Sequence, residues 1–66
     1  MVLKQLEEYF KEELNSLNGF ADKDARWYAV QRCLGVTQFV EMFHPEMSFV
    51  EMDSMFEYYK AKIMEG

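Results

Sequence analysis

Apolar residues recur at steps of three and four along three separate segments of this chain, and this spacing is typical of one face of an α-helix. The stripe in the first segment consists of Leu3, Leu6, Phe10, Leu14 and Leu17. The pattern predicts an amphipathic helix over residues 2–18. Asn18 and Gly19 are expected to end it, since glycine readily adopts the left-handed conformation that follows a helix cap.

The second segment predicts a helix over residues 22–43, and from residue 25 to residue 43 this helix is apolar over nearly its whole circumference. Only the neighbourhood of Gln31 and Gln38 stays polar. Such a helix is stable in water only when neighbours cover it on at least two sides. We expect Asp22 to be its N-cap and His44, followed by proline, to stop it.

Gly35 lies in the middle of this second helix, where a glycine costs about 1 kcal/mol relative to alanine. Two interpretations are open: a close helix crossing at that point, or simple tolerance. We favour the crossing because the adjacent positions are bulky.

The third segment, residues 48–64, begins with a sequence that fits the capping box. In this motif the side chains of Ser48 and Glu51 each bind a backbone N–H of the other residue. The core stripe that follows contains Phe49, Met52, Phe56, Tyr59 and Ile63. The chain has no internal repeat and no linker. The sequence therefore predicts one all-α domain, a small three-helix bundle in which the second helix is central and the outer two run antiparallel to it.

Arg32 falls inside the widest apolar arc of the second helix when residues are plotted at 100° intervals. Glu13 falls inside the buried arc of the first helix. Because an unpaired buried guanidinium is costly, we hypothesise that Arg32 and Glu13 pair at a partly buried helix contact. The alternative is that Arg32 extends its stem over aromatic rings, such as Tyr28, and reaches solvent.

The composition indicates more apolar surface than a small monomer hides easily. Half of the 66 residues are hydrophobic, including six Phe, four Tyr and one Trp. A chain of this length buries only about 60% of the surface that it exposes when unfolded. Cys33 is the single cysteine, so no disulfide within the chain adds stability. These features favour a second copy or another protein that covers part of the surface.

The net charge of −5 argues against binding to nucleic acid or to anionic membranes, which favour clustered basic residues. No apolar run approaches the ~18 residues of a membrane span, and the first residues do not resemble a signal peptide. With its unpaired thiol and six methionines, the chain is expected to be cytoplasmic. A helix-turn-helix nucleic-acid module remains a minor alternative. Its later helix would carry Glu51, Asp53 and Glu57 toward the phosphates.

Glu41 and His44 form a Glu-x-x-His pair, which is the spacing found in di-metal helical bundles. One pair is an incomplete ligand set, so a metal-binding dimer is an alternative and His44 more simply occupies a helix end. Cys33 has no resolving cysteine or local base and is expected to be a small core residue. We expect no catalytic residues, no cofactor and no small-molecule substrate.

Trp27, Val30 and Leu34 form an additional apolar ridge on the second helix, and Tyr58 lies outside the core stripe of the third. Aromatic residues and methionine are enriched where protein surfaces meet. We therefore expect these four residues to form an interface, unless other helices of the same chain cover the ridge. The expected function is non-enzymatic protein–protein association, as a regulator, adaptor or inhibitor that is itself homodimeric.

Overall fold

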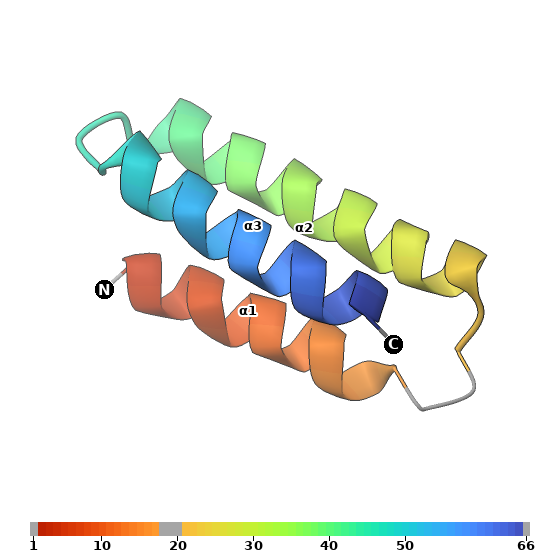
Figure 1. Cartoon of the computed structure of the whole chain (residues 1–66). Coiled ribbons are helices and arrows are strands. Elements are labelled where there is room, and N and C mark those ends of the chain that lie inside the picture. The colour runs from red at the N-terminus through yellow and green to blue at the C-terminus, as the bar shows by residue number, and fades with distance from the viewer. Residues whose placement is uncertain (1, 18–20, 66) are drawn as a thin grey trace.

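The computed structural model describes residues 2–17 and 21–65, and these form a bundle of three α-helices. Helix α1 spans Val2–Ser16, α2 spans Lys23–Phe43 and α3 spans Phe49–Glu65. Neighbouring helices along the chain run antiparallel, and the bundle measures 39 × 17 × 15 Å (Figure 1). The predicted three-helix bundle is confirmed. The expected helix stop at Asn18 and Gly19 lies outside the described residues.

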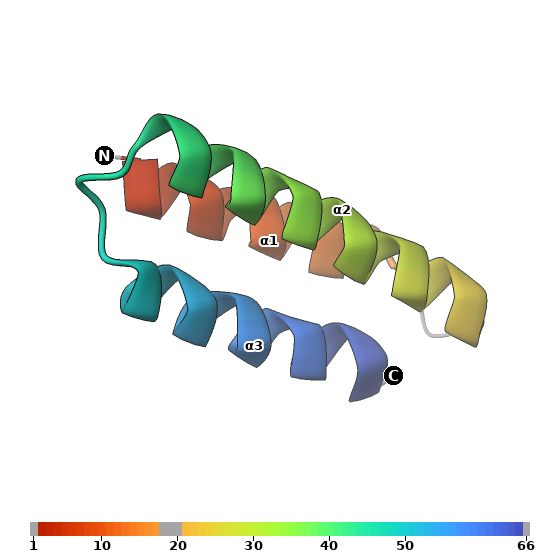
Figure 2. The same cartoon turned by 90° about the horizontal axis from the view of Figure 1, so that it is seen from above.

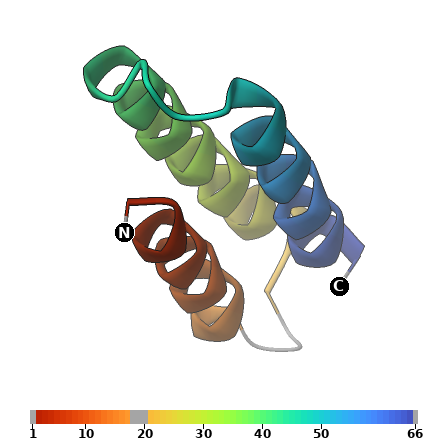
Figure 3. The same ribbon diagram turned by 90° about the vertical axis from the view of Figure 1, so that its left-hand side faces the viewer.

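The three helices occupy the corners of a triangle, as the view along the bundle shows (Figure 3). Each helix contacts both of the others, and one end of α2 extends beyond α1 and α3 (Figure 2). Both neighbours expected for α2 are therefore present, but they do not cover it on two sides as the sequence argument required. Because α1 and α3 also contact each other, they cover α2 from one side only, and its opposite side faces away from the bundle.

The core combines large side chains from α1 and α3 with small side chains from α2. The large buried residues are Leu6, Phe10, Met52, Tyr59 and Ile63. The buried residues of α2 are Ala29, Val30, Cys33 and Thr37. Small side chains on α2 allow the large ones opposite to fill the space between three closely packed helices.

Phe10 and Thr37 show how the two kinds of residue fit together. The ring of Phe10 is fully buried, and its centroid lies 5.7 Å from that of Tyr59 and 6.3 Å from that of Phe56. Thr37 is the buried polar residue of the core, and its hydroxyl donates to the carbonyl of Cys33 at 2.8 Å. This bond satisfies the hydroxyl within its own helix, so that Thr37 packs as a small residue.

Side chains bind the free backbone groups at the starts of α2 and α3. Asp22 accepts a hydrogen bond from the backbone N–H of Ala25 at 2.8 Å, which confirms it as the N-cap of α2. The hydroxyl of Ser48 accepts from the backbone N–H of Glu51 at 3.2 Å. The reciprocal bond from Ser48 N–H to the Glu51 carboxylate is not among the hydrogen bonds of residues 2–17 and 21–65. Half of the predicted capping box is thus formed.

Arg26 connects the start of α2 to the end of α3. Its Nη1 donates to the carbonyl of Ile63 at 2.7 Å, and its Nε donates to the carbonyl of Ala21 at 3.1 Å. The last carbonyls of a helix have no partner inside the helix, and a cation near them interacts favourably with the helix dipole. Arg26 therefore serves as a C-terminal cap for α3.

Candidate protein interface on the second helix

The structure separates the residues that the sequence grouped into one interface. Val30 is buried in the core, so its assignment to an exposed ridge is wrong. Trp27 is exposed and Leu34 is half-buried. Both lie on the same side of α2 as Glu41, because residues seven positions apart nearly align along a helix. Glu41 in turn lies beside Asp53 of α3. Trp27 and Leu34 therefore flank the seam between α2 and α3.

Tyr58 is exposed on a different side of the molecule. Its ring packs edge-on against Tyr59 with centroids 5.1 Å apart, and the ammonium of Lys62 lies 5.6 Å from its centroid. The hydroxyl of Tyr59 donates to Glu7 of α1 at 3.3 Å, so this side of α3 faces α1. Five residues along a helix correspond to a rotation of about 140°, which turns Tyr58 away from Asp53 and from α2. Tyr58 and Trp27 do not form one surface.

The side of α2 that faces away from the bundle carries a different set of residues, which we call the outer face. The members are all exposed and surround Gly35 at helical spacings of three, four and seven: Tyr28, Gln31, Arg32, Gln38, Phe39 and Met42. Tyr28, Phe39 and Met42 are 64%, 60% and 72% exposed. Tyr28 lies about three turns from Phe39 along the helix, with Gln31 and Arg32 between them. Large exposed apolar side chains gathered on one side of a helix are typical of interaction sites.

Gly35 lies at the centre of the outer face, and its surroundings are open. A Cβ atom placed on it would meet no atom of the described residues within 4 Å. The close helix crossing that we expected at this position is therefore wrong within a single copy, because α1 and α3 both pack on the opposite side of α2. Nothing in the packing of the chain requires glycine here.

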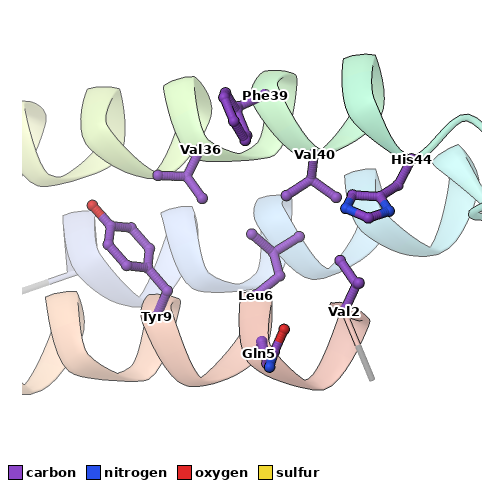
Figure 4. Close-up of a pocket in the computed structure, with 8 residues that line it drawn as sticks. All are labelled: Val2, Gln5, Leu6, Tyr9, Val36, Phe39, Val40 and His44. Carbon is purple, nitrogen blue, oxygen red and sulfur yellow. The ribbon is translucent and has the colours of Figure 1, made fainter.

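An apolar groove adjoins the outer face along the seam between α1 and α2. It has a volume of about 300 Å³ and is lined by Val2, Gln5, Leu6, Tyr9, Val36, Phe39, Val40 and His44. Figure 4 shows Val36 and Val40 pointing from α2 toward Leu6 of α1, with His44 near one end of the groove. Phe39 belongs to both the groove and the outer face. Phe39 therefore joins the groove to the outer face.

The predicted contact between Arg32 and Glu13 is present at the edge of the outer face. The Nε of Arg32 donates to Oε2 of Glu13 at 2.6 Å, and its Nη2 donates to Oε1 at 3.0 Å. The hydroxyl of Tyr9 donates to the same Oε2 at 3.0 Å. The side chain of Glu13 is 12% exposed, whereas that of Arg32 is 52% exposed. The two interpretations of Arg32 thus combine, because it pairs with Glu13 and also reaches solvent.

The pairing controls the ionisation of Glu13. Hydrogen bonding from Arg32, together with that from Tyr9, holds the pKa of Glu13 below its usual value and outweighs the opposing effect of burial. Glu13 is therefore ionised at neutral pH and compensates the charge of Arg32. The outer face of α2 consequently carries no uncompensated charge.

Cys33 lies in the core, as the sequence predicted. Burial, followed by the nearby charge of Glu13, raises the pKa of the Cys33 thiol to about 11. The thiolate is the nucleophilic form of cysteine, so this thiol is unreactive in the folded protein at neutral pH.

Glu41 and His44, the pair with metal-ligand spacing, have other neighbours. Burial and the charge of Asp53 raise the pKa of Glu41, while Nδ1 of His44 lies 3.2 Å from a carboxylate oxygen of Glu46. Within residues 2–17 and 21–65, no group of three His, Cys, Asp or Glu side chains is placed to hold a metal ion.

The arrangement and composition of the helices can be compared with two further kinds of interaction, nucleic-acid binding by a helix-turn-helix and insertion into a membrane. Helices α2 and α3 lie antiparallel and side by side, whereas the two helices of a helix-turn-helix cross at about 90–120° (Figures 1 and 3). In the described part of the chain, no helix combines the length and the apolar character that a membrane span requires.

Comparisons with protein-family models, curated proteins and solved structures find no match to this chain. What the fold itself defines is an all-α protein of three mutually contacting helices. Its function has to be argued from its own surface, and the outer face of α2 is the feature that the packing of the chain leaves unexplained.

Proposed function

We propose that this protein acts by binding another protein chain through the outer face of α2, as a non-enzymatic regulator, adaptor or inhibitor. The observation that carries the proposal is the distribution of side chains on α2. Small residues of this helix fill the core, while Tyr28, Phe39 and Met42 are exposed on its opposite side. Folding of a single copy places these large side chains in water, and a partner would remove them from it.

The area involved is enough to support association. A Tyr or Phe side chain buries 150–250 Å² when fully covered, so the exposed parts of Tyr28 and Phe39 amount to roughly 100 Å² each. At about 25 cal/mol per Å², covering each of them contributes roughly 2–3 kcal/mol before the cost of association. The adjoining groove offers space for an apolar side chain of the partner.

Charge supports the same surface. The outer face contains two glutamines and Arg32, whose charge Glu13 compensates, and it contains no acidic residue. Interface centres are depleted in unpaired charges and enriched in aromatic residues, methionine and arginine. Trp27 lies at the edge of this face on the α3 side, where a wide partner would also contact it.

The proposal is tested with Phe39→Ser and a matched control. Val50 is 76% exposed on α3 and lies outside the outer face, so Val50→Ser removes a comparable exposed apolar side chain elsewhere. Proteins that bind the immobilised wild type are identified by mass spectrometry and purified. Each purified partner is then titrated against the wild type, Phe39→Ser and Val50→Ser, after circular dichroism has shown that the variants are helical.

We expect Phe39→Ser to weaken binding at least tenfold, because about 2 kcal/mol of buried apolar area is lost, while Val50→Ser binds like the wild type. Equal affinity of Phe39→Ser and the wild type for every partner would place the interface elsewhere. If no protein binds and the chain also stays monomeric, the proposal is wrong.

A further inference from the structure

We infer that the chain bound at the outer face is a second copy of this protein, and that the two α2 helices cross antiparallel with Gly35 of each copy at the crossing point. This inference rests on the proposed function, since it assigns a partner to the same surface. It adds the identity, the orientation and the contact point of that partner.

Gly35 is the first observation that supports a crossing helix. A glycine in an exposed helix interior costs about 1 kcal/mol relative to alanine, and no contact within the chain needs it. Its neighbours one turn away on this face are Gln31, Arg32, Gln38 and Phe39, and those two turns away are Tyr28 and Met42. The outer face is therefore low at its centre and high at its sides. Such a surface lets the backbone of a second helix approach closely, as small residues do at other helix crossings.

The distribution of charge is the second observation, and it selects another copy of the chain. Helix α1 carries two lysines and four glutamates, and α3 carries two lysines and four acidic residues, a net charge of −2 each. Helix α2 carries three basic and two acidic residues, a net charge of +1. Two copies with a charge of −5 each therefore repel least when α2 faces α2. A strongly basic partner would instead be attracted to α1 and α3.

The chemistry of the outer face favours the antiparallel orientation. Around a two-fold axis at Gly35, positions at equal distances before and after the glycine face each other. The resulting pairs between copies are Tyr28 with Met42, Phe39 with Gln31, and Arg32 with Gln38. These pairs combine sulfur with an aromatic ring, an amide with an aromatic ring, and a guanidinium with an amide oxygen. A parallel crossing would place Arg32 against Arg32 and align the helix dipoles unfavourably.

The size of the contact predicts a weak dimer. The exposed parts of Tyr28, Phe39 and Met42 supply on the order of 300 Å² per copy, compared with about 800 Å² per partner in a stable interface. We therefore expect a reversible dimer with a dissociation constant on the order of 100 μM. Dilution separates such a dimer without unfolding it.

Sedimentation of the full chain from about 10 μM to about 1 mM tests the inference with Gly35→Glu and a matched control. A Cβ atom at position 35 meets no atom of the described residues within 4 Å, and glutamate is a better helix former than glycine, so the variant is expected to fold. At the crossing point, the same side chain would separate the two backbones and place two charges together. Ala61 is exposed on α3, so Ala61→Glu adds the same charge outside the outer face.

We expect the wild type and Ala61→Glu to change from monomer to dimer over this range, while Gly35→Glu stays monomeric. The orientation is tested by mixing Tyr28→Cys with Met42→Cys, carried on copies of different mass, and oxidising the mixture mildly. Antiparallel α2 helices give mainly the mixed disulfide. Cys33 is buried with its thiol protonated and does not take part.

Three results would overturn the inference: a wild type that stays monomeric at about 1 mM, a Gly35→Glu variant that dimerises like the wild type, or mainly the Tyr28→Cys homodimer after oxidation. The first result leaves the proposed function standing if a purified foreign partner still loses affinity for Phe39→Ser. If that partner is also absent, both proposals fail.

Discussion

Replacing Glu13 with glutamine should destabilise the fold through the loss of a single charge. Glu13 accepts two hydrogen bonds from Arg32 of α2 and one from Tyr9. Glutamine keeps the length of the side chain and one acceptor oxygen. The substitution therefore removes the charge from the contact and leaves its shape nearly intact.

The magnitude follows from the exposure of the two partners. Hydrogen bonds to charged groups contribute about 1.5–3 kcal/mol when buried, whereas exposed ion pairs contribute about 0.2–1 kcal/mol. Glu13 is 12% exposed but Arg32 is 52% exposed, so solvent screens the pair considerably. We expect Glu13→Gln to lower the free energy of unfolding by about 1 kcal/mol. For a domain of this size, the melting temperature should fall by about 4–8 °C.

The pH dependence gives the effect a second signature. Because Arg32 holds the pKa of Glu13 below its usual value, the pair stabilises the fold fully above the pKa of an unfolded glutamate, about 4.3. This stabilisation is lost as the pH falls through the lowered pKa of the folded state. Urea unfolding of the wild type and Glu13→Gln, followed by far-ultraviolet circular dichroism, should differ at pH 7 and converge as the pH falls below the lowered pKa of Glu13.

Glu12→Gln is the matched control, because Glu12 is exposed next to Glu13 on the same helix and the substitution removes the same charge. A double-mutant cycle with Arg32→Met should give a coupling energy of about 1 kcal/mol. The reasoning is refuted if Glu12→Gln destabilises as much as Glu13→Gln, or if the coupling energy is zero.

Two further predictions concern Glu41 and Cys33. Burial and the charge of Asp53 raise the pKa of Glu41, so its ionised form destabilises the fold above that pKa. Glu41→Gln should therefore raise stability at pH 7 by about 0.5 kcal/mol, and the gain should shrink as the pH falls through the raised pKa; equal unfolding midpoints at pH 7 would contradict this. Cys33, buried with a thiol pKa of about 11, should react with maleimide in native buffer only as fast as the protein unfolds. Labelling within seconds in native buffer, as for an exposed thiol, would show that the core is open at this position.

The sequence was sufficient to predict the three helices and several of their contacts. Turn and cap residues mark the boundaries strongly, and Asp22 and Ser48 bind the backbone N–H groups that the patterns indicate. The pairing of Arg32 with Glu13 followed from placing each residue inside an otherwise apolar arc. A charged residue inside an apolar arc needs a partner of opposite charge wherever the helices meet.

The rotation of α2 was not predicted from the sequence, and Val30 was assigned to an exposed surface for that reason. A helix that is apolar on nearly all sides gives no periodic signal that identifies its buried side. The sequence argument assigned the large residues to helix contacts, whereas the structure buries Ala29, Cys33 and Thr37, which are small and recur at steps of four. That repeat of small residues is the signal that would have identified the buried side. The helix crossing expected at Gly35 is absent within a single copy, because this position lies on the side of α2 that faces away from α1 and α3.

The small buried residues of α2 and the exposed residues on its opposite side are under different constraints. Stability depends on the inward positions, where a larger side chain would force α1 and α3 apart. Most outward positions are exposed, so substitutions there, apart from Arg32 with its contact to Glu13, cost little stability. Under the proposed function, binding preference can therefore change through successive substitutions at outward sites while the chain continues to fold.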